Sequence, residues 1–168
     1  ETGLIAVNTH KSIYLPNEIA NISIGVLDSE GGVICDANVT LLVADPNSVL
    51  ANLTTANGNI TVSGVCSAKN KTYIPDYSAN YTVNGIGNYS MNATAAEDDS
   101  LTPNITSNFE VWANVPFDVA RSTATRIFPF VPYIVNISII SNKDYNGIIN
   151  EYTPSSFAIS NVEFYEAA

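Results

Sequence analysis

Few residues of this chain have the types and the spacing that enzymatic chemistry requires. The only histidine, His10, lies beside Lys11 near the start of the sequence. No Gly-x-Ser-x-Gly segment is present, so the setting in which many Ser-His-Asp hydrolases place their nucleophile is missing. We predict that the protein is not an enzyme, and we assign it no catalytic, cofactor-binding or metal-ligating residue.

One acidic run has side chains of the kind that bind calcium. Glu97, Asp98 and Asp99 are consecutive, and carboxylate oxygens are ligands that Ca²⁺ prefers. If the fold brought them close, further ligands could come from Asp28, Glu30 or Asp118. The sequence lacks EF-hand spacing, and a solvated acidic linker is the simpler interpretation of the run. Calcium therefore stays an alternative to the prediction of no metal.

The side chains most often marked for modification are asparagines in Asn-x-Ser/Thr sequences. Such sequences occur ten times, whereas chance pairing of 21 asparagines with 30 serines and threonines predicts about four. The acceptors are Asn21, Asn38, Asn52, Asn59, Asn70, Asn80, Asn88, Asn92, Asn104 and Asn136. N-linked glycans are therefore the one non-protein group that we expect. The alternative is that an Asn-, Ser- and Thr-rich composition produces these sequences without their being occupied.

The positions of these acceptors agree with the period of a β-strand. An attached glycan has to point into solvent, and residues i and i+2 of a strand share a face. Asn21, for example, alternates with the apolar residues Ala20 and Ile22. Six segments, this one included, show the pattern. The residues predicted to face the core are Ala20, Ile22, Ile24, Val26, Ala37, Val39, Leu41, Val43, Ile60, Val62, Tyr81, Val83, Tyr89, Met91, Ala93, Ala95, Val135, Ile137 and Ile139.

Charge and processing indicate an exported protein. The net charge of −10 excludes nucleic acid, because six basic residues cannot replace the counterions around phosphate. No run approaches the roughly 20 apolar residues that span a bilayer, so we expect no direct membrane insertion. The only methionine is Met91, and the opening residues Glu1-Thr2-Gly3 are interpreted as the remnant of signal-peptide cleavage, native or from a secretion vector. An extracellular location, secreted or at the cell surface, follows.

The two cysteines are expected to form a disulfide. Cys35 and Cys66 are too far apart for a Cys-x-x-Cys redox motif and too few for a zinc site. Both continue the apolar phase of their segments, Cys35 with Val33 and Ala37. Two inward cysteines on different strands suit a bridge through a sandwich core. Two reduced core thiols are the alternative.

The chain is predicted to be all-β, with two immunoglobulin-like β-sandwich units. Strand patterns separated by turn clusters recur throughout, and no stretch shows convincing helical periodicity. We place the first unit at residues 1–96 and an acidic, Pro103-containing linker at 97–107. The second unit, residues 108–168, has strands for only part of a sandwich. Either the sequence is cut there, or these strands pack on the first unit, or a neighbouring molecule donates a strand.

Within the first unit, residues 4–96 resemble the macroglobulin-like and related immunoglobulin-like extracellular sandwiches. The resemblance lies in Tyr14-Leu15-Pro16-Asn17-Glu18, in the strands after it, and in Gly87-Asn88-Tyr89-Ser90-Met91. Asn17 stands where the family usually has a glycine, and asparagine tolerates the same turn. The family's reactive members use a Cys–Gln thioester, and this chain has no glutamine. The resemblance therefore implies a fold and no activity.

The second unit resembles the first half of a repeat domain of archaeal and bacterial surface proteins. The resembling stretches are Tyr133–Ile139, Tyr145-Asn146-Gly147 and Glu151–Phe157. We expect a non-enzymatic glycoprotein module with a structural or adhesive role in a surface layer, a fibre or a tandem-domain stalk. Its partners would be proteins, including further copies that join by strand addition.

Two other functions stay open at this stage. One is a recognition module that binds carbohydrate or protein through loops at one end of a sandwich. Trp112, on the phase opposite Phe109 and Val111, is its candidate contact, although a tryptophan there can equally cover a seam between units. The other is a non-catalytic domain of a secreted enzyme.

Overall fold

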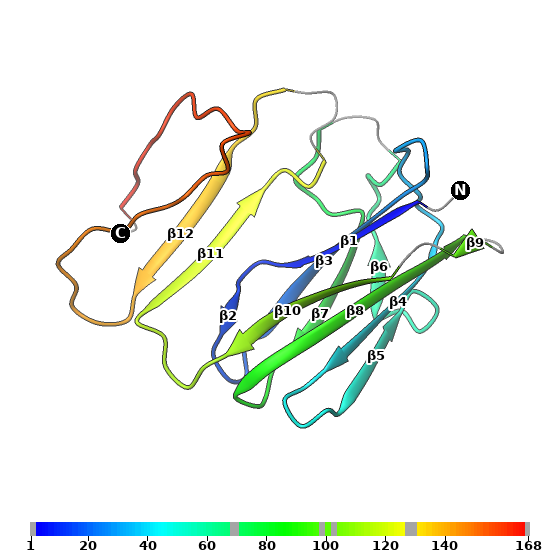
Figure 1. Cartoon of the computed structure of the whole chain (residues 1–168), viewed down its shortest axis with the longest axis horizontal. Coiled ribbons are helices and arrows are strands. Elements are labelled where there is room, and N and C mark those ends of the chain that lie inside the picture. Colours follow the sequence, from blue (N-terminus) through cyan, green and yellow to red (C-terminus); the bar gives the residue numbers. More distant parts are fainter. Residues whose placement is uncertain (1–2, 68–70, 98–99, 102–103, 127–130, 167–168) are drawn as a thin grey trace.

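The computed structural model describes residues 3–67, 71–97, 100–101, 104–126 and 131–166 of the 168-residue chain. These residues contain strands and no helix, and most of the strands form two facing sheets (Figure 1). The first sheet has the order β1 (Leu4–Thr9), β3 (Ile19–Leu27), β7 (Tyr77–Thr82) and β6 (Ile60–Val62). The second has the order β2 (Ile13–Tyr14), β10 (Ile105–Val111), β8 (Gly87–Glu97), β4 (Asn38–Ala44) and β5 (Leu50–Thr54), with β9 (Ser100–Leu101) paired to β8. The predicted all-β, immunoglobulin-like sandwich is confirmed.

The core between the sheets is built from the apolar phase of each strand. Along β3, Ile22, Ile24 and Val26 are at most 2% exposed, while Asn21 between the buried positions is exposed. Val39 on β4 and Met91 on β8 are also buried. Because consecutive side chains of a strand leave on opposite faces, burying one phase sends the other into solvent. The predicted sides of these strands are therefore confirmed.

Aromatic rings fill one region of this core. The rings of Tyr89 and Phe109 stack with centroids 5.0 Å apart, and Tyr14 meets Phe109 edge to face at 5.4 Å. Offset-stacked and edge-to-face arrangements are those that aromatic quadrupoles favour. The three residues come from β8, β10 and β2, which are neighbours in the second sheet. The contacts therefore hold β10 within this sheet.

The turn before β3 has the backbone that the family resemblance implies. Asn17 has a φ of 70°, in the left-handed region that favours glycine. Its amide donates a 2.6 Å hydrogen bond to the carbonyl of Val83, just after β7. Asparagine is the residue that replaces glycine in this conformation most easily, which explains its presence here.

The predicted linker over residues 97–107 is wrong where the structure describes it. β9 pairs with β8 inside this range, and β10 spans Ile105–Val111 and pairs with both β8 and β2. The sandwich therefore extends to Val111, beyond the expected boundaries at residues 96 and 108. Phe109 and Val111 on β10 belong to the core of this sandwich, and not to that of a second unit. The division of the chain into two units stays a prediction.

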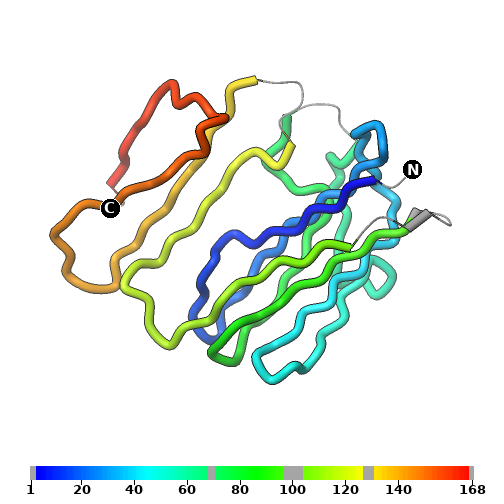
Figure 2. Tube along the Cα trace, viewed as in Figure 1, coloured from blue at the N-terminus to red at the C-terminus, as the bar shows by residue number. Residues whose placement is uncertain are grey.

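The later part of the chain forms a two-stranded antiparallel sheet, β11 (Phe117–Thr123) with β12 (Val135–Ser141). Figure 2 shows this pair beside the sandwich, with the last segment looping back on its far side. Val135, Ile137 and Ile139 were expected to face a core, but they are 37–51% exposed. No second sheet covers them among the described residues, so that part of the prediction is wrong, and the second unit is incomplete here.

Candidate functional site

The predicted glycan acceptors lie on the surface wherever the structure describes them. Asn92 is half-buried, and Asn70 lies outside the described residues. The exposed acceptors are Asn21, Asn38, Asn52, Asn59, Asn80, Asn88, Asn104 and Asn136. Their side chains leave the outer faces or edges of the sheets. The geometry therefore leaves these amides open to modification, whereas their occupancy stays a prediction.

Strand register brings some acceptors together that are distant in the sequence. In the first sheet, Asn21 on β3 pairs directly with Asn80 on β7. In the second sheet, Leu42 on β4 separates Asn52 on β5 from Asn92 on β8. Neighbouring strands are about 4.8 Å apart, so the first pair is one strand spacing apart and the second pair is two.

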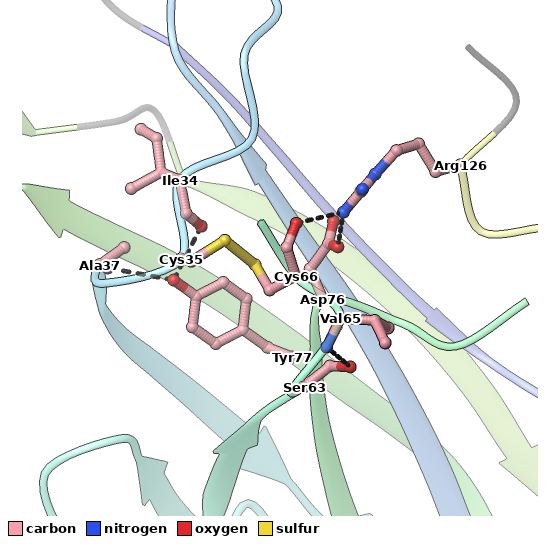
Figure 3. The surroundings of a disulfide bond; sticks show 9 residues. All are labelled: Ile34, Cys35, Ala37, Ser63, Val65, Cys66, Asp76, Tyr77 and Arg126. Carbon is pink, nitrogen blue, oxygen red and sulfur yellow. Dashed lines mark hydrogen bonds and ion pairs between the residues drawn. A yellow bond between two sulfur atoms is a disulfide. The ribbon is translucent and has the colours of Figure 1, made fainter. Parts of the chain in front are cut away.

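The predicted disulfide between Cys35 and Cys66 is present, with Cα atoms 5.8 Å apart (Figure 3). Its location differs from the expected one, because neither cysteine lies on a strand. Cys35 belongs to the β3–β4 connection and Cys66 to the β6–β7 connection. Val62, expected to share the inward phase of Cys66, is 45% exposed. The chain turns after β6, which ends the alternation, so the bridge closes one end of the sandwich.

Two side chains that the sequence analysis did not single out hold this end together. The buried hydroxyl of Tyr77 donates to the carbonyl of Ile34 (2.9 Å) and accepts from the amide of Ala37 (3.0 Å), on both sides of Cys35. The Arg126 guanidinium donates to the carbonyl of Cys66 (2.7 Å) and forms an ion pair with Asp76. Both arrangements appear in Figure 3. No motif marks them, since Asp76 and Arg126 are 50 residues apart.

A cluster of charged side chains connects β11 to the two connections that flank β2. The ammonium of Lys11 lies 2.8 Å from a carboxylate oxygen of Asp118 on β11 and 3.0 Å from one of Glu18. The other oxygen of Glu18 accepts the amide of Leu15 at 2.9 Å. Burial by itself would lower the pKa of Lys11, but the hydrogen bonds to Asp118 and Glu18 outweigh it, and the pKa lies above its usual value.

The raised pKa makes the contribution of Lys11 dependent on alkaline pH. A group whose pKa is higher in the folded state stabilises that state fully below its unfolded pKa, 10.5 for this lysine, and loses the effect as pH rises through the folded pKa. We expect Lys11→Met to lower the free energy of unfolding by about 1 kcal/mol or less at pH 7–9, because the cluster is partly solvated. The difference between the two proteins should shrink above pH 10.5.

Urea unfolding at a series of pH values measures this difference without the screening that guanidinium would add. Asp118→Asn, which leaves Glu18 in place, is the matched control and should have a smaller effect than Lys11→Met. If the difference in unfolding free energy stayed constant from pH 8 into the range where Lys11 loses its proton, the charge of Lys11 would not be what stabilises the fold.

The other candidates for chemistry lie apart from one another. His10 is exposed, and its backbone donates to Asn21 and accepts from Arg121. Asp28 accepts the amides of Glu30 and Gly32 in a turn, and Asp118 is engaged by Lys11. Asp98 and Asp99 lie outside the described residues. Within the described ranges, no three His, Cys, Asp or Glu side chains are grouped so as to hold a metal ion.

The surface of the described residues includes two shallow depressions. One, of about 450 Å³, lies on the outer face of the first sheet and includes His10, Asn21, Asn80, Ile74 and Pro75 in its lining. The other, of about 360 Å³, lies beside Trp112. The tryptophan is 43% exposed, as the alternation predicts, and its indole N–H donates to Glu110 at 2.5 Å.

The chain matches no protein-family model and no curated protein. Among solved structures it is similar to part of chitinase ChiW from Paenibacillus sp. str. FPU-7, described as a cell-surface-expressed multi-modular enzyme machinery. The similarity has a TM-score of 0.47 at 10% identity and covers 66% of this chain but 8% of the chitinase. The described part of the chain contains no apolar helix of membrane-spanning length.

Proposed function

We propose that the protein is a non-catalytic, N-glycosylated structural or adhesive module of a cell-surface assembly. The observation that carries this proposal is that acceptor asparagines and apolar side chains lie on opposite faces of the same strands. Acceptor asparagines occupy outward positions on both sheets, and the inward positions of the same strands are packed apolar side chains. Such a module has outer faces that sugars would cover, which keeps sheet surfaces and edges from associating nonspecifically.

The disulfide supports the extracellular location within this proposal. Disulfides persist in oxidising compartments and are rare where glutathione keeps thiols reduced. The bond between Cys35 and Cys66 joins the β3–β4 connection to the β6–β7 connection. A protein that works outside the cell gains from such a covalent closure at the end of its sandwich.

The partner that we propose is a second copy of this chain. From residue 131 onward the described residues carry exposed apolar side chains, among them Ile148, Tyr152 and Phe164 at 83–91% exposure. Apolar surface of this extent marks an interaction site in soluble proteins. Among the described residues β12 pairs with β11 alone, so its other edge suits strand addition between copies.

Size-exclusion chromatography with light scattering, combined with intact mass before and after deglycosylation, tests this function. We expect a mass that falls on deglycosylation and a population of oligomers that grows with protein concentration. Salt should strengthen the association, because it screens the repulsion between chains of net charge −10. A strictly monomeric, unglycosylated protein at all concentrations would contradict the proposal.

Recognition of a ligand is the second candidate, and the depression beside Trp112 is the observation that favours it. Ser12, Asn88, Asn108 and Glu110 line this depression together with Trp112, so the indole stands next to polar groups. That combination suits a sugar ring, which offers both C–H faces and hydroxyls. A monomer that binds carbohydrate and loses this binding in Trp112→Ala would favour recognition over assembly.

A further inference from the structure

Two of the acceptor asparagines are closer than their positions in the sequence suggest. Asn21 on β3 and Asn80 on β7 are direct partners in the antiparallel register. The carbonyl of Asn21 accepts a hydrogen bond from the amide of His10, on the β1 side. Both backbone polar groups of a strand residue point the same way, so those of Asn21 point away from β7.

Asn21 and Asn80 are therefore a non-hydrogen-bonded pair, the type in which the two Cα atoms approach to about 4.5 Å and the side chains are nearest. Both side chains are exposed on the same outer face. Both also belong to the lining of the depression of about 450 Å³. Its lining also includes His10, Ile74 and Pro75.

From this geometry we infer that Asn21 and Asn80 act as one glycan acceptor position, so that a folded molecule carries a sugar on one of them and not on both. The inference rests on the proposed glycosylation. The first sugar of the attached glycan lies in the depression, against His10, Ile74 or Pro75. A second glycan would begin beside the first and have no separate surface to lie on, because an N-linked glycan is bulky at its point of attachment.

Modification before folding leads to the same outcome. A chain that receives both glycans while unfolded has to bring them together when β3 pairs with β7. Such chains are expected to fold poorly and to be depleted from the secreted, folded protein.

The second sheet provides a matched pair of acceptors for comparison. Asn52 and Asn92 also lie on one outer face, but Leu42 stands between them. Two strand spacings, about 10 Å, separate their strands. Leu42 is 36% exposed, so an open position lies between the two asparagines. We expect this pair to be modified independently.

The experiment is glycopeptide mapping and intact-mass measurement of the whole chain, secreted from a host that attaches N-linked glycans. Asn21→Gln should raise the occupancy of Asn80, and Asn80→Gln should raise that of Asn21, by up to about twofold if the two share one glycan equally. Asn52→Gln should leave Asn92 unchanged. Ser23→Ala and Thr82→Ala remove the same two sequons without altering the asparagines, and they should reproduce the gains.

In the parent protein, the expected result is that the summed occupancy of Asn21 and Asn80 does not exceed one glycan per molecule. Molecules modified at both positions, at the frequency that independent modification predicts, would overturn the inference and leave the proposed function intact. An absence of glycan from both positions while other acceptors are filled would do the same. An absence of glycan from all acceptors would overturn both.

Discussion

Replacing Cys35 and Cys66 together by alanine is expected to lower the free energy of unfolding by about 3–4 kcal/mol. The bond joins cysteines 31 residues apart, and the crosslink stabilises the fold mainly by restricting the unfolded chain. Losing it frees the β3–β4 and β6–β7 connections at that end of the sandwich. An effect of this size is a large part of the stability of a single domain.

Thermal and urea unfolding of the double variant, beside the parent protein with and without reductant, measures this effect. Reduction of the parent should reproduce most of the loss, because it removes the same crosslink without changing a buried side chain. Replacing both cysteines avoids leaving a single reactive thiol. A double variant with the stability of the parent would show that the hydrogen bonds of Tyr77 hold this end without the disulfide.

Asp76→Ala is expected to cost about 3 kcal/mol, the lower end of the range for removing one partner of a buried ion pair. The side chains of Asp76 and Arg126 are only 10% and 11% exposed. Removing the carboxylate leaves the guanidinium charge in poorly solvated surroundings beside the carbonyl of Cys66. The penalty comes from that uncompensated charge more than from the loss of attraction.

A double-mutant cycle with Arg126→Leu separates these two contributions. If the charge left behind dominates, Asp76→Ala with Arg126→Leu should be more stable than Asp76→Ala alone. Hydrogen exchange provides a second readout, since Arg126 follows β11 and its backbone bridges to Thr72. In Asp76→Ala, the loss of protection against amide hydrogen exchange should therefore extend to β11. Equal and additive effects of the two single changes would contradict the assignment of a coupled pair.

The orientation of side chains along most of the sandwich strands could be predicted from the sequence. Ile22, Val39 and Met91 lie inside, and Asn21 and Asn38 lie outside, because alternation is a local property of extended backbone. The left-handed backbone at Asn17 was implied instead by the family resemblance, because the family usually has a glycine at this position. The prediction from alternation was wrong at β12, where Ile137 is exposed. A side chain is buried on one face of a strand only if a second layer of structure packs against that face.

The candidate sites were predictable in kind but not in arrangement. The sequence showed that asparagines carry acceptor signals and that two cysteines were available to pair. It contained no signal that Asn21 and Asn80 are cross-strand partners, or that Arg126 reaches Asp76. Each of these relations depends on which strands become neighbours and in which register, and an isolated strand pattern does not specify its partner.

By itself, then, the order of amino acids determined that the fold is all-β and which side of most strands faces the core or solvent. It also identified the asparagines that carry acceptor sequences. These follow from stereochemistry within a few residues. Tertiary structure alone decided that β10 belongs to the sandwich, that the disulfide closes its end, and that Asn21 and Asn80 are cross-strand partners. Those outcomes arise from packing between distant segments, whose energy is distributed over the whole core.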